Sequence, residues 1–240
     1  MRIGVIGGNG VAATNRLLDM VERRITEAGA FRDSHHPEMI IWQATQAPSR
    51  SMFLEGKGPN WIPDYVHIAT ELKRLGCSIG CMCCNTAHYA IEEIQDKSGL
   101  EFINLLEEVA FKCRDSGKRK FVILCTEGAR KFDIYGKVFS KVFPRAELFY
   151  PDHEKQDLVT RIICLNKTSS RFVADIYKGG NPAKMLTDLC QSFSMPVILG
   201  CTDLRIAYKV EDVLPNNVVA DSLEVLSDKI IDCSIINENV

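Results

Sequence analysis

The sequence predicts an α/β fold of two pseudo-symmetric lobes, each a mainly parallel sheet flanked by helices. Short apolar runs alternate with segments of helical hydrophobic period, which is typical of parallel sheets with helical crossovers. The pattern restarts near Lys118, so we expect lobes at residues 1–116 and 117–216, with residues 217–240 packing back on the N-terminal lobe. Sites in parallel sheets gather beyond the carboxyl ends of the strands. We therefore expect the active site in the cleft between the lobes.

The first lobe begins with a strand and a tight turn. Short apolar runs predict its strands at residues 3–6, 39–42, 78–83 and 102–105. The turn is the glycine-rich segment Gly7-Gly8-Asn9-Gly10. Apolar residues spaced three and four apart predict helices at residues 14–28, 63–75 and about 86–95.

The second lobe repeats this order. Its strands are expected at residues 121–124, 146–150 and 196–199, and a last short strand at 218–220 lies in the segment that packs back on the N-terminal lobe. The segment Cys125-Thr126-Glu127-Gly128 forms the turn after the first of these strands. Helices are expected from that turn to about residue 139, through 158–163 and 185–193, and finally at 223–231.

The composition predicts an ordinary soluble globular protein. Of the 240 residues, 46% are hydrophobic and 25% charged, and the net charge of −2 argues against a broad nucleic-acid surface. No apolar run approaches the length of a membrane span, and the start is interpreted as a strand, not a signal peptide. Most of the ten cysteines lie in apolar runs, which favours reduced thiols in the cytoplasm.

Two distant segments share one arrangement of a thiol and small polar residues. Cys84-Asn85-Thr86-Ala87-His88 and Cys201-Thr202-Asp203 each follow a predicted buried strand. A thiol at a strand end that leads into a helix sits at a helix N-terminus, where the dipole favours the thiolate. The alternative is that both are buried structural thiols, but their polar and similar flanks favour a function. Two such thiols suggest a pair of bases that face one substrate.

Two opposed thiols suit the inversion of an amino acid's α-carbon. The α-proton is very weakly acidic, so its removal needs a strong and poorly hydrated base. Inversion also needs an acid on the opposite face of the carbon, and a thiolate with a thiol supplies both. Asn85, Thr86 and Thr202, with nearby backbone N–H groups, are candidates to bind the substrate carboxylate.

The paired thiol motifs resemble the signatures of the aspartate/glutamate racemase family. The opening Ile3 to Gly10 is similar to that family's first turn, and His36-Pro37 with Arg50 fits its second block. Cys125-Thr126-Glu127-Gly128 fits the start of its second lobe. The resemblance covers nearly the whole chain, and it implies two α/β lobes and catalysis without a cofactor or metal. It also implies a small-molecule amino acid as partner and is compatible with a homodimer.

The resemblance implies a role for each matching residue. Cys84 and Cys201 would be the opposed base and acid, exchanging roles with the hand of the substrate. The α-carboxylate or ammonium would be held by Asn85, Thr86, Thr126 and Thr202. An arginine in the loop after the second strand, Arg50, would bind the side-chain carboxylate together with a lysine.

The lysine and the substrate are the open points. Lys167 is the better match by its position after the helix at 158–163, and Lys178 competes with it. Asn9 stands where the family usually has Met, and we expect it to touch the substrate pocket. Aspartate and glutamate therefore both remain candidates.

Several alternatives compete with this interpretation. Cys81-x-x-Cys84 could belong to a redox pair or a zinc site, but the sequence has no second Cys-x-x-Cys or His-x-His pair to complete a zinc site. The segment 8–13 fits a loose dinucleotide pattern, but no acidic residue ends the second strand. Related two-lobed proteins isomerise maleate, racemise hydantoins or decarboxylate malonates, and a non-catalytic binding protein is also compatible with the fold. His88 is expected to orient the Cys84 turn through hydrogen bonds.

Overall fold

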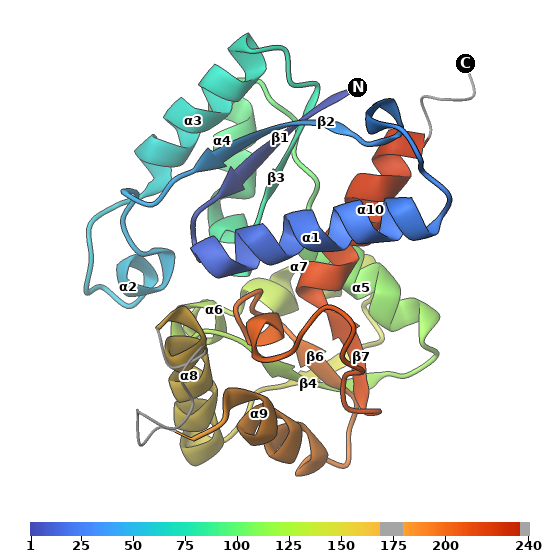
Figure 1. The fold of residues 1–240 in the computed structure, drawn as a ribbon. Helices are drawn as coiled ribbons and strands as arrows, with labels where there is room; N and C mark the ends of the chain where they lie inside the picture. Colours follow the sequence, from blue (N-terminus) through green and yellow to red (C-terminus); the bar gives the residue numbers. More distant parts are fainter. Residues whose placement is uncertain (169–179, 236–240) are drawn as a thin grey trace.

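The computed structural model describes residues 1–168 and 180–235, which form two parallel sheets stacked with helices between and outside them (Figure 1). The first sheet has the order β2-β1-β3. Its strands are β1 (Arg2–Gly7), β2 (Glu38–Gln43) and β3 (Ile79–Met82). The second sheet has the order β5-β4-β6-β7. Its strands are β4 (Lys120–Leu124), β5 (Glu147–Phe149), β6 (Val197–Leu199) and β7 (Val218–Asp221).

The helices form three layers around the two sheets (Figure 1). Those between the sheets are α1 (Val11–Glu27), α5 (Leu105–Asp115), α7 (Ile134–Val142) and α10 (Ser222–Ile235). The first sheet is covered on its outer face by α3 (Ile62–Arg74) and α4 (Ile91–Ser98). The second is covered by α8 (His153–Lys167) and α9 (Pro182–Gln191). The predicted α/β fold of two lobes is confirmed.

Short helices complete the chain near the strand ends. The α-helical ones are α2 (Arg50–Leu54) and α6 (Glu127–Lys131). The 3-10 helices are η1 (Asp33–His35), η2 (Asn85–Ala90) and η4 (Leu204–Ala207). No helix of the described residues is long and apolar enough to cross a membrane.

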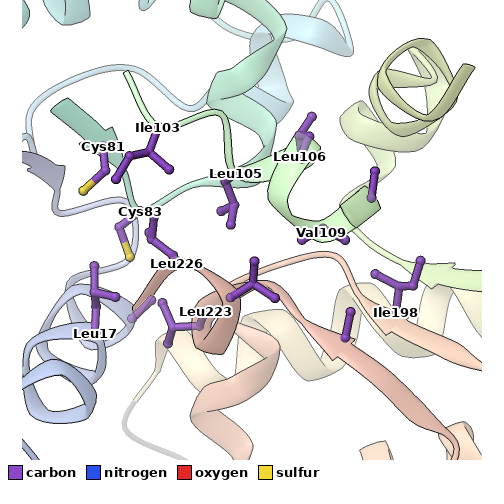
Figure 2. Packing of buried hydrophobic residues seen from close by; sticks show 14 of the residues in the cluster. Leu17, Cys81, Cys83, Ile103, Leu105, Leu106, Val109, Ile198, Leu223 and Leu226 are labelled. Carbon is purple, nitrogen blue, oxygen red and sulfur yellow. The ribbon is translucent and has the colours of Figure 1, made fainter. Parts of the chain in front are cut away.

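One core lies between the sheets and joins the two lobes (Figure 2). Successive side chains of a strand point to opposite faces, so the two faces of each sheet enter different cores. In β4, Phe121 and Ile123 pack in the shared core, whereas Val122 and Leu124 pack against α8 and α9. Burying apolar surface on both faces explains why these strands are continuous apolar runs.

The structure corrects four sequence-based expectations about elements. The strand expected at 102–105 is a single bridge between Gly80 and Phe102, because Asn104 caps α5 instead. The helix expected at 86–95 is divided into η2 and α4. The helix expected up to residue 139 is two helices, α6 and α7, separated at Asp133, which has a φ of 45°. Arg50 begins α2 and is not in a loop.

The last segment divides between the lobes. Strand β7 pairs with β6 in the second sheet. Helix α10 packs against both α1 and α5. Of the segment 217–240, expected to pack on the N-terminal lobe, the strand thus belongs to the second sheet and the helix reaches the first lobe.

Candidate active site

The site lies where four parallel strands end. The turns after β1, β3, β4 and β6 carry Asn9, Cys84, Thr126 and Cys201. Gly8 makes the first turn possible: its φ is +84°, and a Cβ there would lie 2.7 Å from the Ala44 nitrogen. The two sheets therefore direct their functional turns toward one another.

All nine residues proposed from the sequence line one cavity of about 40 Å³. Both thiols reach it, Cys84 with 8% and Cys201 with 6% of its surface exposed. The full lining is Asn9, Ser49, Arg50, Ser51, Cys84, Asn85, Thr86, Thr126, Lys167, Cys201, Thr202 and Asp203. Lys178, the competing lysine, lies outside the described residues.

The Cys84 turn is held by His88. The Leu105 N–H donates to His88 Nε2 at 3.2 Å, so His88 carries its proton on Nδ1 and donates it to the Cys84 carbonyl oxygen at 3.0 Å. Burial lowers the pKa of His88 to about 4, which keeps the ring neutral. The expected orienting role of His88 is confirmed.

The Cys201 thiol differs from the sequence-based expectation. Only a turn and the four-residue η4 follow it, in place of a regular α-helix, and Cys84 leads into the 3-10 helix η2. Burial raises the pKa of Cys201 well above its usual value, and the Asp203 carboxylate adds to this effect while Lys167 opposes it. The expectation of a regular helix after Cys201 was therefore wrong, and loss of water favours the neutral form of its thiol. Cys201 is therefore held as a thiol near neutral pH.

Arg50 is buried beside Cys84. Ser49 caps α2 by accepting from the Met52 N–H at 3.3 Å, which places Arg50 at the first helical position. Its Nη1 donates to the Pro48 carbonyl oxygen at 2.8 Å, whereas its buried Nε has no hydrogen-bond partner among the described residues. Burial lowers the pKa of Arg50, but Cys84 and Tyr65 more than compensate, so the pKa is raised overall. The guanidinium is thus a cation with donor capacity left for a ligand.

Lys167 meets Asp203 at the edge of the cavity. Its Nζ lies 2.9 Å from Asp203 Oδ2. Partial burial lowers the pKa of Lys167, but Asp203 and Cys201 raise it more, so the amine stays charged. Asn166 Nδ2 donates to the Asp203 carbonyl oxygen at 2.8 Å, and a Cβ on Gly10 would collide with Asp203 Oδ1. Asp203 is therefore fixed between the two lobes.

The amide and hydroxyl side chains are already engaged. Asn9 Nδ2 donates to the Gly7 carbonyl oxygen at 3.1 Å and to the Tyr65 hydroxyl. The Thr86 and Thr126 hydroxyl oxygens are 3.0 Å apart, and Thr202 donates to the Cys83 carbonyl oxygen at 3.3 Å. These groups are therefore oriented before any ligand binds.

The sequence analysis did not identify three of the residues that line the cavity. Ser49 and Ser51 flank Arg50, and Asp203 follows Cys201 by two positions. Ser51 Oγ accepts from the Gly128 N–H at 3.1 Å, which joins α2 to α6 across the lobes. The signal available in the sequence was the run Ser49-Arg50-Ser51, in which two hydroxyl side chains flank the arginine that was predicted to bind a carboxylate.

Two larger hollows adjoin the cavity through shared lining residues. One, of about 360 Å³, shares Asn9, Arg50 and Asp203 with it, and the other, of about 470 Å³, shares Ser51 and Thr126. Lys167 lines all three spaces. Within residues 1–168 and 180–235, no three His, Cys, Asp or Glu side chains are grouped to hold a metal ion.

Solved structures share this fold at low sequence identity. The aspartate racemase of Picrophilus torridus has a TM-score of 0.77 and 21% identity, with 97% of this chain and 94% of that chain covered. Glutamate racemase isoform RacE1 from Bacillus anthracis has a TM-score of 0.65 and 17% identity, with 99% and 81% covered.

Sequence comparison gives the family. The broad specificity amino-acid racemase RacX of Bacillus subtilis (strain 168) is 26% identical over 155 residues, 64% of this chain. The match spans 66% of RacX, just under two thirds of its length. The model of the Asp/Glu/Hydantoin racemase family matches residues 3–228. The chain therefore belongs to the Asp/Glu/hydantoin racemase family.

Proposed function

We propose that this protein racemises an acidic amino acid, aspartate or glutamate, by proton transfer between two cysteines. The observation that carries the proposal is that Cys84 and Cys201, from different lobes, line one cavity together with two cationic side chains. A pair of structural thiols would need neither those cations nor the hydroxyl groups between them. Family membership supports the same reaction class.

Each thiol takes one half of the reaction. One thiolate removes the α-proton, and the opposite thiol gives its proton to the other face of the carbanion. The first cysteine then carries the proton and the second is a thiolate, so the reverse direction uses the same groups in exchanged roles.

The cations select the substrate charge and stabilise the carbanion. Arg50 offers two parallel hydrogen bonds to a carboxylate, and Lys167 offers a point charge. We assign the cavity hydroxyls of Thr86, Thr126 and Thr202 to the binding of the α-carboxylate or the ammonium group. Thr202 would accept from the ammonium group, because its own proton is donated to the Cys83 carbonyl oxygen. The chemistry needs no cofactor, because two thiols supply both the base and the acid.

The cavity must open to admit an amino acid. Its volume of about 40 Å³ holds only a few water molecules. The Lys167–Asp203 ion pair borders both the cavity and the 360 Å³ hollow, so its separation would join them. A substrate carboxylate that binds Lys167 would replace Asp203 as the negatively charged partner of this lysine.

The decisive experiment follows the α-hydrogen in heavy water. Each enantiomer of aspartate, glutamate and alanine is incubated with the reduced protein, and α-deuterium and enantiomer composition are measured. We expect exchange and inversion for one or both acidic substrates. Because the RacX relative is named for broad specificity, inversion of alanine at an equal rate would favour that wider activity. Binding without exchange would indicate a non-catalytic relative, and no exchange or binding with any of these substrates contradicts the proposal.

A further inference from the structure

Tyr135 touches the turns of both proposed catalytic thiols. It lies on α7, is fully buried in the core between the sheets, and its hydroxyl accepts a hydrogen bond from Asn85 Nδ2 at 2.6 Å. Asn85 directly follows Cys84. Tyr135 therefore restrains the Cys84 turn from the opposite lobe.

The same Asn85 side chain is held at its other end. The Ser222 hydroxyl, at the start of α10, donates to Asn85 Oδ1 at 3.2 Å. Both Ser222 and Asn85 are almost completely buried, so these hydrogen bonds have little competition from water. The carboxamide is thus clamped by two groups that both come from the C-terminal half of the chain.

The Tyr135 ring also covers the residue before Cys201. A Cβ on Gly200 would lie 2.9 Å from Tyr135 Oη and 3.1 Å from Cε2, closer than ordinary packing allows. Glycine at this position therefore lets the ring rest directly on the strand end. Burial raises the pKa of Tyr135 well above its usual value, so its contacts are those of a neutral phenol.

We propose that Tyr135 is a positioning residue that fixes the separation of Cys84 and Cys201 across the lobes. The inference rests on the racemisation proposed above. Removal of the α-proton needs one thiol at the right distance, whereas inversion needs both at once. A small displacement of one reacting group can lower a rate by orders of magnitude. Loosening the Tyr135 link should therefore impair inversion more than exchange.

The test is the ratio of inversion to α-hydrogen exchange in heavy water. In Tyr135→Phe the ring stays and only the hydroxyl is lost, so we expect this ratio to fall about tenfold with KM nearly unchanged. Tyr150→Phe is the matched control: Tyr150 donates to Asp133 Oδ1 at 2.7 Å, so it also loses one hydrogen bond, but one between side chains that do not line the cavity. Its ratio should equal that of the wild type. Equal ratios for Tyr135→Phe and the wild type would overturn the inference.

Two further substitutions, Asn85→Ala and Ser222→Ala, separate positioning from a loss of stability. Adding Tyr135→Phe to Asn85→Ala should change the ratio no further, because the hydroxyl acts through Asn85. If Tyr135→Phe does not fold, Ser222→Ala removes the other restraint on Asn85 and should lower the ratio in the same direction. An unchanged ratio in that variant would also count against the inference. A wild-type protein that neither exchanges nor inverts would refute the proposed function itself.

Discussion

The hydroxyl oxygens of Thr86 and Thr126 lie 3.0 Å apart and join the two lobes within the lining of the candidate site. Thr86 lies in the 3-10 helix η2 that follows β3, and Thr126 lies in the turn after β4. Thr126 has a second task, because its hydroxyl caps α6 by accepting from the Ala129 N–H at 3.3 Å. Both hydroxyls thus line the site, but only that of Thr126 also stabilises a helix.

This difference predicts unequal effects of two matched substitutions. Thr126→Val should lower the free energy of unfolding by about 1 kcal/mol more than Thr86→Val, because it also removes a helix cap. Both variants should raise KM, since each removes a hydroxyl from the cavity. Thr126→Ser keeps the hydroxyl and should restore stability and KM. Urea unfolding with steady-state kinetics tests this, and equal destabilisation by the two valines would contradict it.

The two cysteines should be separately indispensable for inversion. Cys84→Ala and Cys201→Ala should each abolish racemisation while leaving folding nearly intact, because each removes one side of the proton transfer. Cys84→Ser should retain exchange from one enantiomer only. Cys164→Ala removes an exposed thiol and serves as the control. Wild-type inversion by either single alanine variant would exclude the two-base mechanism.

Arg50 should determine the preference for an acidic substrate. Loss of a charge-assisted bond to a buried carboxylate costs about 2–5 kcal/mol, so Arg50→Ala should lose that much on aspartate and glutamate but less on alanine. Arg50→Lys keeps the charge but loses the paired donors, and it should also be impaired. The measurement is kcat/KM on the three substrates. An equal loss on all three substrates, or no loss, would mean that Arg50 is not the ligand of the side-chain carboxylate, and Lys167 or Lys178 would then be the better candidate.

Asp203 should tune the titration of Cys201. Burial and then the Asp203 charge raise the pKa of Cys201, so Asp203→Asn should lower it and leave Lys167 as an unpaired cation nearby. In a Cys84→Ala background, the pH midpoint for Cys201 alkylation by iodoacetamide should shift downward, as followed by peptide mass spectrometry. Asp188→Asn, which breaks an exposed pair with Lys184, is the control. A midpoint that does not move, or that moves up, would contradict this assignment.

The sequence predicted the fold because strands and helices depend on local signals, and it predicted nine of the twelve cavity residues because strand-end position and the family resemblance indicate them together. Apolar runs such as that of β4 identify strands, and the ends of parallel strands identify the place of a site. Contacts between distant residues leave no such signal. Neither the Lys167–Asp203 pair nor the hydrogen bond from Asn85 to Tyr135 could be predicted.

Local preference was also overridden by packing in particular places. The apolar run at 102–105 resembled a strand, but Asn104 accepts from the N–H groups of Leu106 and Glu107 and starts α5. The pKa of Cys201 depends on how much water the fold removes, which a motif does not report. The positions of the motifs therefore predicted which side chains lie together, whereas the protonation state of Cys201 could be inferred only from the structure.

His88 should make the protein less stable in mild acid. Its Nε2 accepts from the Leu105 N–H, so protonation in the folded state would remove an acceptor in a buried site. The pKa is about 4 in the folded protein and 6.5 in the reference state, so between these values the unfolded chain binds a proton that the native protein does not. The stabilisation is present above pH 6.5 and is lost as pH falls towards 4.

The expected size of this effect follows from the pKa difference. Between pH 7.5 and pH 5, His88 should lower the free energy of unfolding by about 2 kcal/mol, and His88→Gln, which cannot titrate, should lack that part of the pH dependence. Asp221, whose pKa is raised by burial, acts in the opposite sense but equally in both proteins, so the comparison cancels it. His153→Gln, at an exposed position of α8, should keep the wild-type pH dependence. Urea unfolding at the two pH values measures the difference, and parallel curves for wild type and His88→Gln would show that His88 is not the group responsible.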